Sequence, residues 1–486
     1  MAEGDDLRQQ RLAKLDRLRQ QGVDPFPRRY KRTIMADEAV ERFEQLGGVE
    51  LRLAGRIVGM RVMGRASFAH IMDGSGRIQI YARSDVLGEE RYQLFKALDV
   101  GDFLGVSGTL FQTRTGEVTV QVTDFELLAK SLRPLPEKWH GLTDVEKRYR
   151  QRYLDLISSP EVRRVFRIRS AVIASMRRFL QERGFIEVET PVLQPLYGGA
   201  AARPFETYHN ALDRSLYLRI ATELYLKRLI VGGFEKVFEI GKNFRNEGIS
   251  VKHNPEFTVM ESYEAYADYY DVMDMVEQMV QSIALDVLGT DLITYQGNQI
   301  SLKPPWKRIT LRDAILEHSG IDIAQFPTQE ALYSKMVELN VRVVPGMPRG
   351  KLVDDLLSAF VEPKLIQPTF VLDYPAELSP LAKKKADDPT LVERFEGFIG
   401  GLELANAFTE LNDPIDQRER FVRQLEDRAA GDEEAHILDE DFILALEHGM
   451  PPTGGLGIGV DRLVMVLTDQ YSIREVILFP QLRSFG

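Results

Sequence analysis

Residues 238–263 read FEIGKNFRNEGISVKHNPEFTVMESY, and the expected fold of the larger part of the chain follows from this stretch. Apolar Phe238 and Ile240 lead into a polar, glycine-containing loop at 246–254, and an apolar, aromatic segment comes next. This pattern predicts a strand, a turn and a second strand. Alternation along the second strand would give one face to Phe257, Val259, Glu261 and Tyr263. A carboxylate and a phenol beside an aromatic ring suit the wall of a cleft better than a hydrophobic core.

Polar groups gather on the loop between these strands. Arg245 offers a planar fork of donors that can hold a phosphate or a carboxylate with two hydrogen bonds. Glu247, His253 and Asn254 follow in the loop, and Phe257 supplies a ring for stacking. An exposed hairpin with solvated charges is the alternative, because short motifs have real false-positive rates. As a whole, the stretch resembles motif 2 of the class II aminoacyl-tRNA synthetases (F-R-x-E, loop, H-x-x-x-F). Its form FRNEGIS-x-x-HNPEFT-x-ME-x-Y is similar to that of the lysyl-tRNA synthetases.

Composition limits the broad class of the protein. The chain has 486 residues, enough for two or three domains, and it contains no cysteine, which excludes disulfides, thiolate metal sites and cysteine nucleophiles. Its acidic, polar start is unlike a secretory signal, and no apolar run is long enough to span a membrane. We therefore expect a cytoplasmic protein with no membrane partner. The net charge of −11 argues weakly against broad nucleic-acid binding, although basic clusters at 28–32 and 147–152 are either a local basic face or solvated surface.

The first part of the chain predicts a helical extension (residues 1–48) and then a barrel (residues 49–130). Leucines recur at near-helical spacing over 6–21, and Gly22 ends that helix. About five short strands separated by turn signals follow, which is typical of an OB-fold, a small closed barrel that binds single-stranded nucleic acid.

An anticodon site is the functional interpretation of this barrel. Phe68 and Gln79 fall on neighbouring strands near Arg61, so a ring could stack on a base and an amide could read its edge. The alternative is that Phe68 is core and Gln79 an exposed strand residue. The resemblance favours the first, because the family's anticodon-reading Phe and Gln match these two positions.

Residues 131–160, which contain Pro134 and Pro136 and then a basic run, predict a linker to a second domain at 161–486. That domain would start with a helix from Arg163 to Arg183 and the strand FIEVETPVL, in which Pro191 belongs at a sheet edge or an interface. The pair resembles motif 1, which forms the dimer interface of class II synthetases and therefore implies a homodimer.

Two acidic groups suggest ligand chemistry. Glu223 begins a predicted helix among apolar residues, and its charge needs a partner, which would be either a substrate ammonium or a structural Arg or Lys. At 393–412 two strands would meet at a Gly-Gly turn and bring Glu396 and Glu403 together. Hard oxygen ligands suit Mg²⁺ bridged to phosphates, and cross-strand charge decoration is the alternative. Period two places a further set on one face, namely Asn406, Phe408 and Glu410.

The last motif is GGLGIGVDRLVMVL at 454–467. Its glycines recur every second residue, so it is not a dinucleotide-binding fingerprint but a strand face without side chains, suited to a flat ligand. Asp461 would open a helix, and Arg462 could reach a phosphate or lie over a ring. The segment resembles motif 3 of the class II synthetases.

Three motifs in this order imply an α+β fold, with an N-terminal OB-fold β-barrel and a class II synthetase catalytic domain built on an antiparallel sheet flanked by helices. The implied reaction activates L-lysine with ATP, with release of pyrophosphate, and transfers it to tRNA(Lys), with Arg245 and Arg462 as catalytic residues and Mg²⁺ as cofactor. The resemblance implies ATP binding by Arg245, Glu247, His253, Asn254, Phe257, Glu396, Glu403 and Arg462, with Glu396 and Glu403 holding the metal. It implies lysine binding by Gly199, Glu223, Glu261, Tyr263, Asn406, Phe408 and Glu410.

The sequence departs from the family pattern at Ala405, and two other classes of protein share some of its features. Ala405 replaces a glycine found in some members and would trim the pocket, as in a paralogue that attaches β-lysine to elongation factor P but lacks the barrel. A protein-lysylating ligase is therefore one alternative. A non-catalytic OB-fold RNA-binding protein is another, although it would not explain an intact Arg245, Glu396, Glu403 and Arg462.

Overall fold

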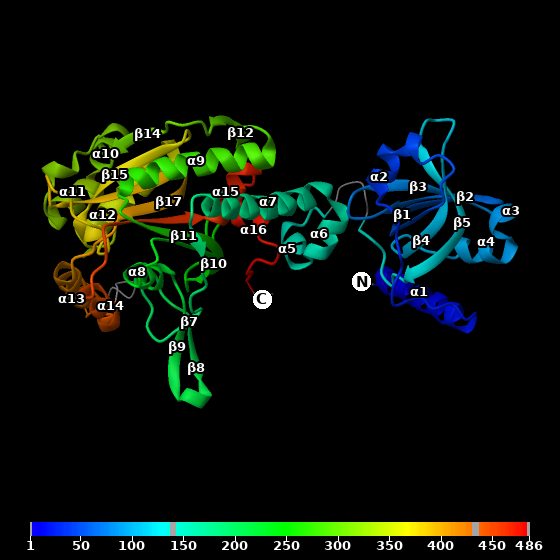
Figure 1. The fold of residues 1–486 in the computed structure, drawn as a ribbon, viewed down its shortest axis with the longest axis horizontal. Helices are drawn as coiled ribbons and strands as arrows, with labels where there is room; N and C mark the ends of the chain where they lie inside the picture. Colours follow the sequence, from blue (N-terminus) through cyan, green and yellow to red (C-terminus); the bar gives the residue numbers. More distant parts are fainter. Residues whose placement is uncertain (1, 137–141, 430–436, 484–486) are drawn as a thin grey trace. The chain divides into compact units, whose positions relative to one another are not determined.

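The computed structural model describes residues 2–136, 142–429 and 437–483, and the chain divides into two compact units, Met1–Thr143 and Asp144–Gly486 (Figure 1). Within the described residues, none of the helices is both long and apolar enough to cross a membrane.

The first unit is a closed five-stranded barrel with a helical extension, as predicted. Its strands, in the order β1-β2-β3-β5-β4, are β1 (Leu51–Met63), β2 (Ala66–Met72), β3 (Arg77–Arg83), β5 (Val118–Ala129) and β4 (Phe103–Gln112). Its helices are α1 (Ala2–Gln20), α2 (Ala36–Glu41), α3 (Ser84–Leu87) and α4 (Glu89–Lys96). Buried and partly exposed side chains alternate along β1 and β2, so every second residue fills the barrel core.

An eight-stranded sheet organises the second unit. Its order is β14 (Lys307–Thr310), β15 (Thr369–Pro375), β16 (Leu391–Ile399), β17 (Leu402–Thr409), β18 (Thr453–Gly459), β11 (Glu256–Ala265), β10 (Lys236–Phe244) and β6 (Ile186–Glu187). The two outermost pairs are parallel and the five inner pairs antiparallel. One face packs against the main core under α7 (Pro160–Glu182), α9 (Tyr269–Leu288) and α15 (Val460–Leu467) (Figure 1). The other face is therefore left for a site.

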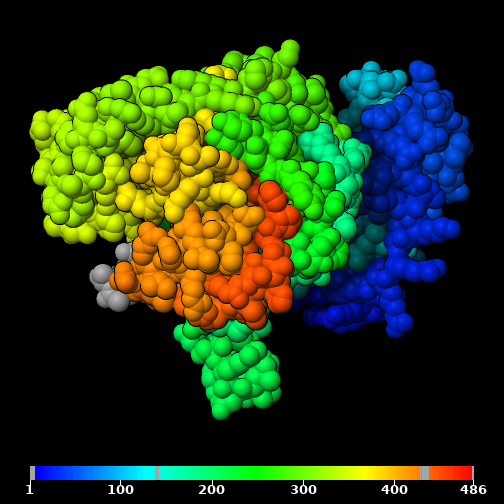
Figure 2. All heavy atoms as spheres, turned by 60° about the vertical axis from the view of Figure 1, so that its left-hand side comes forward, coloured from blue at the N-terminus to red at the C-terminus, as the bar shows by residue number. Residues whose placement is uncertain are grey.

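Smaller elements surround this sheet. The chain segment that connects β14 to β15 contains α10 (Leu311–Ser319), α11 (Gln329–Glu338) and α12 (Arg349–Leu356), and these helices form a separate hydrophobic core. Another holds α8 (Glu223–Val231), α13 (Pro414–Ala429) and α14 (Glu440–Glu447) together. A three-stranded sheet of β7 (Leu193–Gln194), β9 (Arg214–Leu218) and β8 (Glu206–His209) forms an arm that projects from the unit (Figure 2). A hairpin of β12 (Leu292–Tyr295) and β13 (Asn298–Ser301) completes the strands.

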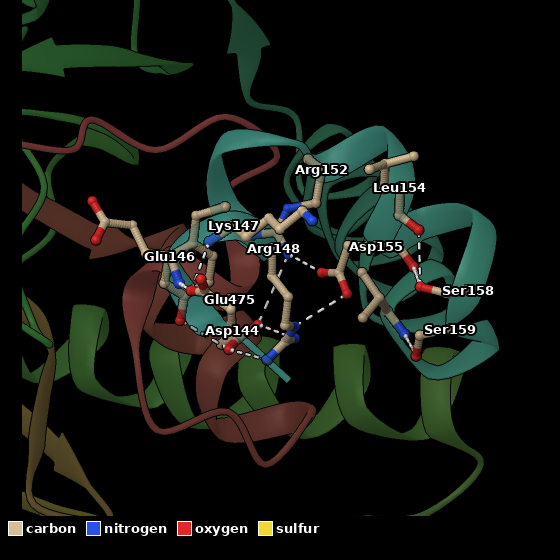
Figure 3. Close-up of polar contacts among 12 residues, drawn as sticks. Asp144, Glu146, Lys147, Arg148, Arg152, Leu154, Asp155, Ser158, Ser159 and Glu475 are labelled. Carbon is tan, nitrogen blue, oxygen red and sulfur yellow. Dashed lines mark hydrogen bonds and ion pairs between the residues drawn. The ribbon is translucent and has the colours of Figure 1, made fainter. Parts of the chain in front are cut away.

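Part of the stretch expected to be a linker is helical. Residues 137–141 lie outside the described residues, but α5 (Val145–Arg150) and α6 (Arg152–Ser158) follow and dock on α16 (Ile473–Val476). Arg148 pairs with Asp155 at 3.1 Å and with Glu475 at 3.0 Å (Figure 3). Arg152 is fully buried, pairs with Asp155 at 2.7 Å, and donates to the carbonyl oxygens of Arg474 and Leu478. This basic run is thus partly interior rather than solvated surface.

Candidate active site

A cavity of about 540 Å³ lies on the sheet face opposite the main core. The three central strands β17, β18 and β11 supply its floor, and α8, the loop after β10 and the start of α15 supply walls. Most of the residues expected to act at the site line it: Gly199, Glu223, Arg245, Glu247, His253, Asn254, Phe257, Glu261, Tyr263, Glu403, Asn406, Phe408, Glu410 and Arg462. The stretches 238–263, 393–412 and 454–467 are far apart in the sequence, and they meet at one cavity because their strands β11, β17 and β18 are neighbours in the sheet.

Arg245 stands at the end of β10, directly before the loop. Its backbone N–H donates to the Pro255 carbonyl at 2.9 Å, and its guanidinium carbon lies 5.1 Å from the centre of the Phe257 ring. Burial lowers the pKa of Arg245 from its ordinary value. Its Nε atom has no hydrogen-bond partner within the described chain, so this buried donor is available to a ligand.

The loop histidine and asparagine are fixed by different contacts. His253 Nδ1 lies 2.9 Å from Ser250 Oγ, and its Nε2 lies 3.3 Å from Arg462 Nη2. Partial burial, followed by the Arg462 guanidinium, lowers the pKa of His253, which favours the neutral ring. The Asn254 amide donates to the Glu256 carbonyl at 2.6 Å and accepts from the Gln481 N–H at 3.3 Å, so its side chain stabilises the loop as well as lining the cavity.

The glycine strand β18 leaves room for large neighbours. A Cβ at Gly455 would overlap Glu410 Oε1 and lie 2.6 Å from Tyr263 Cε1. At Gly457 a Cβ would meet nothing nearer than 3.8 Å, so this part of the floor faces open space. The strand passes directly into α15, whose third residue, Arg462, points back to β17 and donates to the Glu403 carboxylate at 2.9 Å.

The hairpin of β16 and β17 brings the two expected metal carboxylates to paired strands. Glu396 lies opposite Asn406, and Glu403 opposite Phe398, with a bulge between the two pairs. Burial raises the pKa of Glu396 to about 8. Burial also works against the charge on Glu403, but Arg462 outweighs it and lowers the pKa of Glu403. Glu396 pairs with Arg394 and does not line the cavity, so Glu403 is the more accessible of the two carboxylates.

A buried acidic pocket occupies another part of the cavity. Glu223 begins α8, Glu261 lies on β11, and Glu410 follows β17, and all three are buried. Glu261 accepts hydrogen bonds from the Thr222 N–H at 3.1 Å and the Asn243 amide at 3.2 Å. Burial raises the pKa of Glu261, and burial raises the pKa of Glu410 to about 8. These carboxylates create a strong preference for a cationic ligand.

The protein partner of Glu223 is a lysine on its own helix. Lys227 is fully buried, its Nζ lies 2.5 Å from Glu223 Oε1, and it also pairs with Glu410. Burial works against the charge on Lys227, but the two carboxylates outweigh it and raise its pKa, so it stays protonated. The structural alternative for Glu223 is therefore present, while the cavity beside it still has room for a substrate ammonium.

The outer face of the barrel carries the residues expected to read an anticodon. Arg61 lies opposite Phe68 in the ladder of β1 and β2, and the Phe68 ring stacks on Tyr81 with 4.5 Å between centres. Gln79 donates to Glu117 at 2.7 Å and accepts from Thr119 at 2.8 Å. Phe68 and Gln79 are only partly buried, so the ring and the amide are accessible on one face.

Comparison with known families matches both units. A model of the class II tRNA synthetases (D, K and N) matches residues 144–483, and a model of the OB-fold nucleic acid binding domain matches residues 51–128. The chain belongs to the class II tRNA synthetases.

Curated members of this synthetase family are similar over almost the whole chain. A lysine–tRNA ligase of Carboxydothermus hydrogenoformans is 60% identical over 473 residues, which are 97% of this chain and 97% of that protein. The lysine–tRNA ligase of Moorella thermoacetica is 57% identical over 98% of each chain. That of Chloroflexus aurantiacus is 58% identical over 99% of this chain and 98% of the relative.

Sequence reasoning about this synthetase missed two residues and misplaced one. Lys227 could have been found, because it lies four residues after Glu223 on the same predicted helix, and residues at that spacing share a face. Asn243, which holds Glu261, gave no signal beyond its place in β10. The expectation that Ala405 trims the pocket was wrong: its methyl group packs in the main core, since Asn406 and Phe408 take the opposite face of β17.

Proposed function

We propose that the protein acts as a lysine–tRNA ligase. It activates L-lysine with ATP to lysyl-adenylate and pyrophosphate, and then transfers the lysyl group to the 3′-terminal adenosine of tRNA(Lys). The observation that carries the choice of amino acid is the group of three buried carboxylates, Glu223, Glu261 and Glu410, in the cavity that also contains Arg245. Lys227 balances one of these charges, and an amino acid without a side-chain ammonium would leave part of the remaining negative charge uncompensated.

In the first step the carboxylate of lysine attacks the α-phosphorus of ATP, and pyrophosphate leaves. Arg245 holds the substrate carboxylate and the α-phosphate, so two mutually repelling anions approach each other beside one guanidinium. Arg462 and His253 bind the outer phosphates and so stabilise the negative charge that develops on the departing pyrophosphate. The residues perform no covalent chemistry, and catalysis is positioning together with electrostatic stabilisation.

The adenine ring lies between Phe257 and the Arg462 side chain, above the glycine strand, with Glu247 and Asn254 placing its edge. Lysine extends toward the acidic pocket, where Glu223 and Glu410 neutralise its side-chain ammonium. The pocket is completed by Gly199, Glu261, Tyr263, Asn406 and Phe408. Unpaired buried oxygens support a polar occupant: within the described residues, Asn406 Oδ1 and Glu410 Oε1 have no hydrogen-bond partner.

Glu396 and Glu403 would hold Mg²⁺. Their oxygen atoms are the hard ligands that this cation prefers, and the low pKa of Glu403 supplies one ionised carboxylate. No group of three or more acidic or histidine side chains with metal-binding geometry occurs among the described residues, which suits an ion that takes its other ligands from phosphates and water. When bound, the ion neutralises phosphate charge.

We further infer a cytoplasmic homodimer that binds tRNA through the barrel. Apolar side chains near the sheet edge at β6 are exposed, among them Ile186, Val192 and Leu193, and a second copy would cover them. Phe68, Gln79 and Arg61 would contact the anticodon.

Exchange of pyrophosphate into ATP, run with each amino acid in turn and with β-lysine, tests this function. Exchange that requires L-lysine is expected. A preference for β-lysine would favour the protein-lysylating alternative, which leaves the barrel unexplained. Exchange with no amino acid would overturn the enzymatic assignment.

A further inference from the structure

Lys227 is a cation placed among the groups that would bind the substrate. Its amine is fully buried at the second turn of α8, with Nζ 2.5 Å from Glu223 Oε1 and in an ion pair with Glu410. Glu223 is on the same helix, whereas Glu410 follows β17, so one ammonium ties two walls of the cavity together. An isolated buried ammonium is costly, and this one persists because both carboxylates stabilise it.

The charges around Lys227 can be counted from the elements packed there. Glu223, Glu261 and Glu410 contribute three carboxylates, and Tyr263 on β11 contributes a neutral phenol. Arg394 on β16 is matched by its own partner, Glu396. Lys227 therefore compensates one carboxylate and leaves two negative charges when all three are ionised.

These two negative charges are balanced by the two positive charges of a particular substrate. L-Lysine carries two ammonium groups near neutral pH, one at the α-carbon and one at the end of its side chain. Its carboxylate is taken up by Arg245 in the proposed function, on which this inference rests. An amino acid with one ammonium would leave one buried negative charge uncompensated.

We propose that Lys227 is a positioning and specificity-determining residue: it orients Glu223 and Glu410 and sets the residual charge of the pocket to match an amino acid with two ammonium groups. The amine does not touch the reacting atoms, so it acts through the carboxylates. It also limits the effect of burial, which raises the pKa of Glu223 and of Glu410, because the Lys227 ammonium lowers the pKa of both carboxyls against that rise.

The test compares lysine-dependent pyrophosphate exchange in the unmodified protein, Lys227→Gln and Lys227→Arg. Glutamine can still donate hydrogen bonds to both carboxylates but has no charge, while arginine keeps the charge and changes the shape. At neutral pH we expect the KM for lysine to rise at least about tenfold in Lys227→Gln and less in Lys227→Arg, with kcat changing less than KM.

The pH profile separates charge from shape. Without Lys227 the pKa values of Glu223 and Glu410 would rise further, so these carboxyls would stay protonated to a higher pH than in the unmodified protein and regain their charge only as pH increases. The KM ratio of Lys227→Gln to the unmodified protein should therefore shrink from about pH 7 to about pH 9. Titration of free lysine affects both proteins equally and cancels in this ratio.

Norleucine, which has the shape of lysine without the terminal ammonium, probes selectivity as a competitive inhibitor. We expect its inhibition constant, relative to the KM for lysine, to fall at least about tenfold in Lys227→Gln. A constant KM ratio across pH together with unchanged norleucine selectivity would reduce Lys227 to a structural role and overturn the proposal. If Lys227→Gln does not fold, Lys227→Met replaces it in the comparison. A lower KM for lysine in Lys227→Met than in Lys227→Arg would also overturn the proposal. Absence of lysine-dependent exchange in the unmodified protein would instead refute the proposed function.

Discussion

Arg462 Nη1 donates both to the backbone carbonyl of Glu403, at 2.7 Å, and to its carboxylate, at 2.9 Å. The adjacent residue, Asp461, accepts hydrogen bonds from the Arg169 guanidinium at 2.6 Å and from the Thr258 N–H at 2.6 Å. The start of α15 is thus fixed to β17 on one side and to β11 and α7 on the other. The arginine proposed to bind phosphate and the carboxylate proposed to hold metal therefore keep one relative position without any ligand.

Replacement of Arg245 should separate amino-acid activation from tRNA binding. In Arg245→Ala the α-phosphate and the substrate carboxylate lose their shared cation, so lysine-dependent pyrophosphate exchange should fall by about 1000-fold or more. Binding of tRNA, measured by filter retention, should change by less than about twofold because the proposed anticodon contacts are on the barrel. Arg214→Ala, an exposed arginine on the arm, is the matched control and should keep exchange. Equal loss of both activities in a folded Arg245→Ala protein would refute the division of roles.

The stacked ring of the barrel makes a complementary prediction. Phe68→Ala should raise the KM for tRNA in charging by about tenfold, because stacking of a base on an aromatic ring contributes about 1–3 kcal/mol. Pyrophosphate exchange should not change. Phe103→Ala removes another partly exposed ring of the same barrel, one covered by Arg56 at 4.2 Å, and should leave charging intact. Unchanged charging by Phe68→Ala would remove Phe68 from the anticodon site.

Affinity for lysine should increase with pH up to about pH 8. Burial raises the pKa of Glu410 to about 8, so this carboxyl is protonated below that pH and ionised above it. A protonated carboxyl cannot neutralise an ammonium, so the KM for lysine should fall by up to about tenfold per pH unit between about pH 6 and about pH 8. The KM for ATP should not show this pH dependence. Glu410→Gln should have a high KM for lysine that changes less with pH. An unchanged pH dependence of this KM in the variant would mean that another group is responsible for it.

Gly455 should be intolerant of a side chain. A methyl group there would overlap Glu410 Oε1 and crowd Tyr263, so Gly455→Ala should displace both from the acidic pocket and raise the KM for lysine at least about tenfold. Gly47→Ala is the control, since a Cβ at that glycine of the barrel unit meets nothing within 4 Å. Normal lysine affinity in Gly455→Ala would mean that Glu410 does not bind the substrate.

Stability of the second unit should depend on Arg152. Arg152→Met leaves Asp155 and two carbonyl oxygens without this donor, which should lower the free energy of unfolding by about 3–5 kcal/mol. Lys147→Met, an exposed cation of the same basic run, should change it by less than about 0.5 kcal/mol. Urea unfolding followed by circular dichroism would measure both, and equal effects would contradict the special role of the buried guanidinium.

Local pattern predicted the faces of the sheet well. Alternation alone put Glu261 and Tyr263 on one side of β11 and Asn406 and Phe408 on one side of β17, because the period of a strand is fixed by its geometry. The same rule should have assigned Ala405 to the core, and the error came from reading a family variation as a pocket contact.

Long-range partners could not be predicted in this way. The basic run at 147–152 gave no sign that Arg152 is buried. Two acceptors of the Arg152 guanidinium are backbone carbonyls more than 300 residues along the chain, and since every residue has a carbonyl, the sequence does not mark them. Glu396 and Glu403 were expected to come together, and the hairpin brings them to paired strands. Their unequal exposure depends on Arg394 and on a bulge that the alternation of residues does not reveal.

The contact of Arg152 with Leu478 has a consequence for the order in which the protein is made. These two residues are 326 positions apart, so the guanidinium acquires its carbonyl acceptors only after almost the whole polypeptide has been synthesised. The barrel, by contrast, closes its ladders within the first 143 residues. Since domains generally fold as units in order of synthesis, we expect the barrel to form during translation and the catalytic unit to complete its fold only near release from the ribosome.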